Sequence, residues 1–172
     1  MKTLFVAILI TLMTVSGYSQ GVGGTNLKVQ LQSIQSIRIN EAQSDVAISL
    51  ATASEYMNGK SSSQADHIEI MSNSNYEIKV SASTNLIGDT GSIDINTVTV
   101  TPSLGSVGGA TDGNIQLNPV SLSLNDNTIV QSFQGDAQRS FNIQYQLAGG
   151  EEYLNKPAGT YSTLVTYTIL AP

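Results

Sequence analysis

The sequence contains no cysteine, no tryptophan and a single histidine in 172 residues. Without cysteine the chain has no disulfide bonds, no thiolate metal ligands and no cysteine nucleophile, so packing and sheet hydrogen bonds must stabilise the fold. A catalytic triad or a zinc site needs several partners for its histidine. We therefore expect His67 to be a solvated polar residue at the start of a strand, and we expect a non-enzymatic protein without a metal or cofactor.

Charge is also scarce, since charged residues make up 12% of the chain. The formal net charge is −6, and the few lysines and arginines are scattered along the sequence. Proteins that bind nucleic acid carry clustered basic residues that neutralise phosphates. Nucleic acid is therefore not expected as a partner. Serine, threonine, asparagine and glutamine are frequent instead, and they suit the solvent-facing side of antiparallel sheets.

The longest apolar run lies near the amino terminus. Residues 4–15 are largely apolar, Lys2 precedes them, and small and polar residues follow. This layout is typical of a secretory signal peptide and is too short for a membrane-spanning helix. We predict that residues 1–19 are a signal peptide and that residues 20–172 form one exported domain. Its destination is the cell surface, the medium or the periplasm, and the mature chain has no transmembrane segment.

Alternation of apolar and polar residues with a period of two dominates the rest of the chain. Strands are predicted at residues 27–31, with a phase slip to Ile34 and Ile37, and at residues 45–51, 93–100, 115–124, 141–147 and 160–170. Residues 67–71 and 76–82 are predicted to form a β-hairpin. The pattern predicts an all-β, antiparallel β-sandwich of immunoglobulin-like or Greek-key type with eight to nine strands. A barrel is the alternative.

Several segments lack alternation and are predicted as loops or turns. Residues 52–66 are polar, residues 102–114 are rich in glycine, and residues 149–152 join two glycines to two glutamates. Aspartate and asparagine cluster at residues 89–94, 112–114 and 125–127, a composition that suits calcium ligands as well as turns. None has the spacing of a known calcium loop, so we interpret these clusters as turns.

The chain closes on an alternating segment. Tyr161, Val165, Tyr167 and Ile169 lie on one face of the predicted strand, and Leu164 and Leu170 lie on the other. Apolar residues on both faces predict a strand that is covered on both sides, and therefore central or interface-forming rather than a free edge.

Two stretches resemble a known family. Residues 74–80 (SNYEIKV), together with residues 159–161 (GTY) and 166–172 (TYTILAP), resemble the layout of WxL-type cell-surface domains. The entry into the last strand is also similar to spore-coat-U-like fimbrial domains. The resemblance implies a secreted β-sandwich, and in the WxL-type family it implies attachment to peptidoglycan. Tyr76 and Ile78 would occupy the first motif and Tyr167 and Ile169 the second, as surface-binding residues, with tyrosine in place of tryptophan.

Three functions remain open on these observations. The first is a cell-envelope or cell-surface protein that acts as a structural or adhesion module, with an envelope component or another surface protein as partner. The second is a pilus or filament subunit that self-assembles by β-strand addition, with residues 21–26, which precede the first predicted strand, as a mobile donor arm. The third is a secreted carbohydrate-binding module.

Overall fold

The computed structural model describes residues 21–109 and 112–172, and the chain divides into two units, Met1–Leu31 and Gln32–Pro172. The predicted signal peptide, residues 1–19, lies outside the described residues. In the first unit, residues 21–31 form neither helix nor strand, and their side chains are exposed. The strand predicted at residues 27–31 is therefore not formed.

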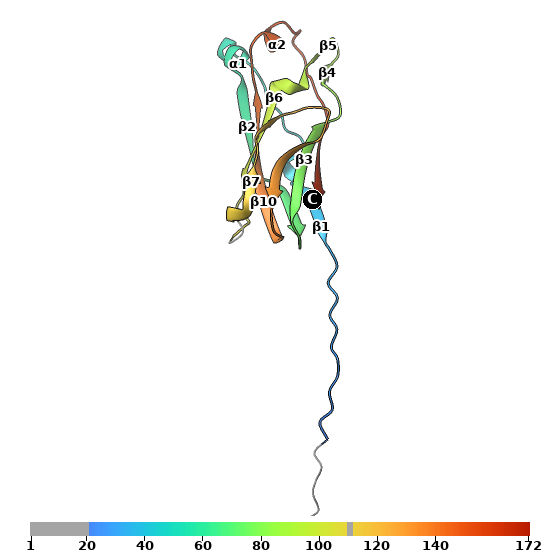
Figure 1. Cartoon of the computed structure of the whole chain (residues 1–172). Coiled ribbons are helices and arrows are strands. Elements are labelled where there is room, and N and C mark those ends of the chain that lie inside the picture. The colour runs from blue at the N-terminus through green and yellow to red at the C-terminus, as the bar shows by residue number, and fades with distance from the viewer. Residues whose placement is uncertain (1–20, 110–111) are drawn as a thin grey trace, which may run out of the picture. The chain divides into compact units, whose positions relative to one another are not determined.

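The second unit contains two antiparallel sheets, most of whose strands are labelled in Figure 1, and their inner faces share one apolar core. The larger sheet has the strand order β1 (Gln35–Ile39), β2 (Lys60–Ser72), β10 (Asp136–Leu147), β6 (Val98–Leu104), β8 (Val120–Ser121). The smaller has the order β11 (Val165–Leu170), β3 (Tyr76–Ala82), β9 (Asn127–Ser132), β7 (Ile115–Leu117). A separate pair joins β4 (Leu86–Gly88) to β5 (Gly91–Ile93). The predicted all-β sandwich is confirmed, and residues 21–109 and 112–172 contain eleven strands rather than eight or nine.

The helices are short. They are α1 (Ala53–Asn58), α2 (Glu151–Leu154) and the 3-10 turns η1 (Glu41–Gln43), η2 (Ile95–Thr97) and η3 (Asp112–Asn114). A capping box starts α1, because Thr52 Oγ1 accepts a hydrogen bond from the Glu55 amide while the Glu55 carboxylate accepts one from the Thr52 amide. The loop predicted at residues 52–66 is therefore wrong, since α1 and the first half of β2 occupy it. The glutamate pair predicted as a turn begins α2.

The predicted hairpin of residues 67–71 and 76–82 is also wrong. β2 pairs with β1 and β10, whereas β3 pairs with β11 and β9, so the chain crosses from one sheet to the other between them. Ser72 supports this crossing by donating its hydroxyl to the Ser74 carbonyl at 2.7 Å. Ile70 and Ile78 are both buried on inward faces, so β2 and β3 lie across the core from each other.

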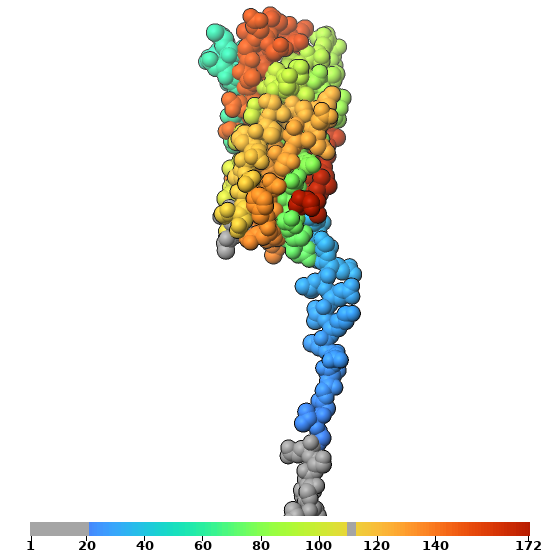
Figure 2. Space-filling view, in the orientation of Figure 1, coloured from blue at the N-terminus to red at the C-terminus, as the bar shows by residue number. Residues whose placement is uncertain are grey.

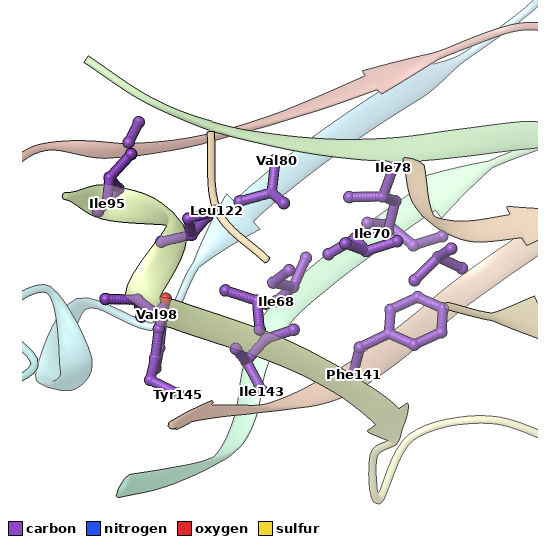
Figure 3. Close-up of a cluster of buried hydrophobic side chains, with 14 of the residues drawn as sticks. Ile68, Ile70, Ile78, Val80, Ile95, Val98, Leu122, Phe141, Ile143 and Tyr145 are labelled. Atoms are coloured by element: carbon purple, nitrogen blue, oxygen red, sulfur yellow. The ribbon is translucent and has the colours of Figure 1, made fainter. Parts of the chain in front are cut away.

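The core is one layer between the sheets. Figure 3 shows side chains from β2, β3, β6 and β10 converging there. Its fully buried apolar members include Ile68, Ile78, Val80, Val100, Ile129, Val130, Phe141 and Ile143. Val46 and Ile48 pack against the same core, although residues 45–51 form no ladder and the strand predicted there is absent. Alternation thus identified the buried face of this segment without identifying a strand.

Two irregularities shape the sheets. Asp66 has a φ of 48° in the left-handed region, at a register shift of β2 against β10 between Phe141 and Ile143. Aspartate tolerates that conformation better than most residues, and its amide donates to Asn142 Oδ1 at 2.8 Å. Pro119 separates β7 from β8, so the predicted strand at residues 115–124 is split between the two sheets. Both pieces are edge strands, where a missing N–H is tolerated.

The last strand is shorter than predicted and lies at an edge. β11 pairs with β3 alone among the described strands, so the prediction of a central strand is wrong. Val165, Tyr167 and Ile169 do face the core, as the alternation predicted. Leu164 and Leu170 are exposed, and no described segment covers them.

Replacing Ile78 tests the position of the core. Ile78→Ala should lower the free energy of unfolding by about 2–5 kcal/mol, because it removes a fully buried side chain and leaves a cavity. The matched control Leu164→Ala removes a side chain that is 68% exposed and should change stability by less than about 0.5 kcal/mol. Urea unfolding followed by circular dichroism measures both. Equal losses in the two variants would contradict this assignment of the core.

Candidate functional site

The structure brings the two predicted motif strands together. β3 and β11 are neighbours, with Ile78 opposite Ile169 and Tyr167 opposite Val80. Their motif side chains face inward, however. Tyr76 and Ile78 are fully buried, and Tyr167 and Ile169 pack against the core. The prediction that these residues form a surface-binding site is therefore corrected, because the apolar face of each strand is the face that covers the other sheet.

Tyr76 belongs instead to a buried polar cluster with Asp136 and Arg139. Its hydroxyl donates to Asp136 Oδ2 at 2.7 Å, and Arg139 Nε lies 2.9 Å from Asp136 Oδ1. Asp136 and Arg139 are 5% and 1% exposed. Burial raises the pKa of the Tyr76 hydroxyl, and the hydrogen bond to Asp136 raises it further. Tyr76 therefore remains a hydrogen-bond donor, and the carboxylate is shared between a hydroxyl and a guanidinium.

A second polar group crosses the core at His67. The ring is 3% exposed, so the expectation of a solvated histidine is wrong. Its Nδ1 lies 3.0 Å from Gln43 Oε1, and its Nε2 lies 3.1 Å from the Tyr145 hydroxyl. The Tyr145 and Tyr167 hydroxyls are 2.7 Å apart. We call these four residues the His67 relay. It links η1 to β2, β10 and the edge strand β11.

The direction of the hydrogen bonds in the relay follows from the amide of Gln43. Its Nε2 donates to the Ala65 carbonyl at 2.8 Å, which turns Oε1 toward the imidazole. His67 Nδ1 therefore carries the proton, and Nε2 accepts from the Tyr145 hydroxyl, which in turn accepts from Tyr167. Burial lowers the pKa of His67 and raises the pKa of both tyrosines. All three groups are neutral near pH 7.

A third polar group lies at the bulge of β2. The Asp66 carboxylate accepts hydrogen bonds from the Ser106 amide at 2.7 Å, from the Ser106 hydroxyl at 2.6 Å and from Ser140. These bonds, those from Ser106 foremost, hold the pKa of Asp66 below its ordinary value. A β-carbon at Gly105 would overlap Ser140 and Asp66, so glycine permits this close approach. The group anchors the segment after β6 onto β10.

The aspartate and asparagine clusters and two surface hollows were compared with the requirements of a metal site. Across residues 21–109 and 112–172, no three histidine, aspartate or glutamate side chains are arranged to hold a metal ion. Asp94 caps η2, and Asn125 and Asn127 donate hydrogen bonds to the Ser123 hydroxyl within a turn. The surface has two open hollows. The first is lined by Arg38, Ile39, Asn40, Glu41 and Glu69. The second is lined by Asn85, Asp94, Ile95, Asn96, Leu122, Ser123, Leu124 and Asn125. Turn hydrogen bonds use the polar groups of the second hollow.

The outward faces of the larger sheet are polar and uncharged over much of their area. In its ladders Gln144 lies beside Ser63 and Thr101, and Gln146 lies beside Ser61 and Thr99. Arg38 and Glu69 form an ion pair on the same sheet, nearer β1. Figure 2 shows one side of the second unit in space-filling form, with yellow and orange segments at its centre, orange-red segments above them, and green and dark red segments at one edge.

Comparison of the chain with models of protein families finds no match, and a search of curated proteins finds no relative. None of the helices in the part of the chain that the structure describes is long and apolar enough to span a membrane.

Removing the Tyr76 hydroxyl tests the buried cluster. Tyr76→Phe should lower the free energy of unfolding by about 1.5–3 kcal/mol, because it takes a donor from a buried, charged carboxylate. Tyr161→Phe is the matched control, since the Tyr161 hydroxyl donates to the Pro157 carbonyl near the surface and its loss should cost less than about 0.5 kcal/mol. Denaturant unfolding measures both. A Tyr76→Phe variant as stable as the wild type would show that the cluster does not depend on this bond.

Proposed function

We propose that this protein is an exported structural module of the cell envelope or cell surface, and that it attaches to partners by β-strand addition at β11. The observation that carries the proposal is the character of this edge. β11 is six residues long, carries no charged side chain, and pairs on one side only in the described structure. β1 lies close to β11 but forms no ladder with it. An edge whose backbone groups are unpaired is a template for another strand.

The other edges are better protected. β8 and β7 are only two and three residues long and flank Pro119. β1 carries Arg38, which forms an ion pair with Glu69 on β2. Short strands, proline and charge are the common devices that prevent pairing at an edge. β11 has none of them between Val165 and Leu170.

Export and surface location rest on the predicted signal peptide and on the resemblance to WxL-type and spore-coat-U-like domains. The buried positions of Tyr76 and Ile78 count against binding through those side chains. Attachment through the backbone of β11 needs no exposed aromatic ring, and it agrees with an adhesion or structural role.

A filament subunit is the second candidate, and residues 27–31 favour it. Leu27, Val29 and Leu31 alternate with Lys28 and Gln30, and the three apolar side chains are at least 73% exposed. Such a segment is suited to pair with a sheet edge and bury one face. In this version, residues 27–31 of one copy add to β11 of the next.

A carbohydrate-binding module is the third candidate. It would bind a neutral polysaccharide on the outward face of the larger sheet, which is uncharged over much of its area.

A lysine on the edge strand tests strand addition. Thr166→Lys should reduce retention of the mature protein on intact cells and purified envelopes by about tenfold, which corresponds to about 1.4 kcal/mol of lost pairing. Gln144→Lys is the matched control, because Gln144 lies on the outward face of β10 with ladder partners on both sides. Sedimentation of cell fractions measures retention. Wild-type protein that stays in the supernatant would contradict the proposal. An equal loss of retention in both lysine variants would indicate attachment through the outward face of the larger sheet instead of through β11.

The filament version predicts assembly by the chain alone. Unboiled gels should show a ladder of heat-resistant multimers, and the double variant Leu27→Asp with Val29→Asp should abolish it. Changing Lys28 and Gln30 to aspartate alters the other face of the segment and should leave the ladder in place. A single monomer band from the wild-type protein would count against a filament and leave attachment to another partner open.

A further inference from the structure

The His67 relay joins the edge strand to the rest of the sandwich by more than its ladder. β11 contributes Tyr167, whose hydroxyl lies 2.7 Å from that of Tyr145 on β10. The Tyr167 ring also meets the His67 ring edge to face, with centroids 5.9 Å apart. These contacts run across the core from the smaller sheet to the larger one. Within that pathway the only group that titrates between pH 5 and 8 is His67.

Protonation of His67 is incompatible with the closed relay. Nδ1 already carries a proton toward Gln43, so a second proton must be placed on Nε2. Nε2 would then point a donor at the Tyr145 hydroxyl, which would have to turn its own proton toward Tyr167. The Tyr167 hydroxyl would then have no acceptor for its own proton, because the Tyr145 oxygen that accepts it in the neutral relay would now donate to Tyr167. An unsatisfied buried donor and a buried cation both favour opening.

No charge in the surrounding elements offsets the imidazolium. The groups that face His67 are the neutral Gln43 from η1, Tyr145 from β10 and Tyr167 from β11. The carboxylate of Asp66, the preceding residue on β2, is occupied by Ser106 and Ser140. Glu41 in η1 is exposed to solvent. Desolvation therefore acts on His67 without a compensating carboxylate.

We propose that the His67 relay is a proton-sensitive latch that holds β11 closed at neutral pH and releases it in mildly acidic solution. Release would free the edge of β3, which pairs with β11 when the latch is closed. The inference concerns the isolated folded chain, so it stands or falls separately from strand addition to a partner.

The sign and the range of the pH dependence follow from linkage. His67 has its ordinary pKa, about 6.5, when β11 is open and water reaches the ring, and a lower pKa when β11 is closed. Between the two values the open state binds more protons, so acidification favours opening by at most about tenfold per pH unit. Well above pH 6.5 both states are neutral, and well below the closed-state pKa both are protonated. In these two ranges the equilibrium between open and closed β11 does not change with pH.

Hydrogen exchange of the full mature chain tests the latch. After correction for intrinsic exchange, amides of Val165–Leu170 should exchange up to about fivefold faster at pH 5.5 than at pH 6.5, because the open state is already half protonated at pH 6.5. Amides of β6, which has no member of the relay, serve as the internal reference. His67 is the only histidine in the sequence, so its ring signal in NMR reports the titration directly.

The variant His67→Gln removes the titrating group and should make β11 exchange independent of pH over this range. If that variant does not fold, the wild-type titration decides alone. A His67 midpoint at or above 6.5, pH-independent exchange of β11, or equal acceleration in β6 and β11 would each overturn the proposal. The last result would mean that acid unfolds the whole sandwich instead of releasing its edge.

Discussion

The inward side chains of β2 and β10 pack against those of β3 and β9, and in a chain without cysteine this apolar layer keeps the two sheets together. The order of strands makes the apolar layer necessary for the sheets to form. β10 pairs with β2 and β6, and β3 pairs with β9 and β11, so most neighbours within a sheet are distant in the sequence. Few ladders can form before the sheets pack, and folding through such non-local contacts is cooperative and slow.

The layer tolerates two polar groups because the members of each group interact with one another inside it. Asp136 receives a hydroxyl and lies against a guanidinium, and the His67 relay runs from Gln43 to Tyr167. Removing one member of such a group leaves the rest unpaired at low dielectric, whereas the apolar neighbours would tolerate small shifts. These groups therefore favour one register between the sheets, which apolar side chains alone specify less sharply.

Alternation predicts which way a side chain points but not which strand lies beside it. That is why the core-facing residues of β11 were predicted correctly while the hairpin was not, since residues 72–75 suit a crossing between sheets as well as a tight turn. The first half of β2 was missed because Ser61 and Ser63 show no apolar period. The capping box of Thr52 and Glu55 was readable in the sequence. The partners of His67 were not, because Tyr145 lies 78 residues away.

The residue that ties β11 to the core also determines how exposed the edge becomes. A free edge is a hazard in a stable sandwich, and β11 lacks the charge and proline that usually protect one. Tyr167 supplies a different restraint, because it holds the strand from its inner face and leaves the outer edge without a ladder partner among the described strands. A partner that pairs with closed β11 would stabilise the closed state by mass action and oppose proton binding at His67. Strand addition and the state of the latch are then coupled through one side chain.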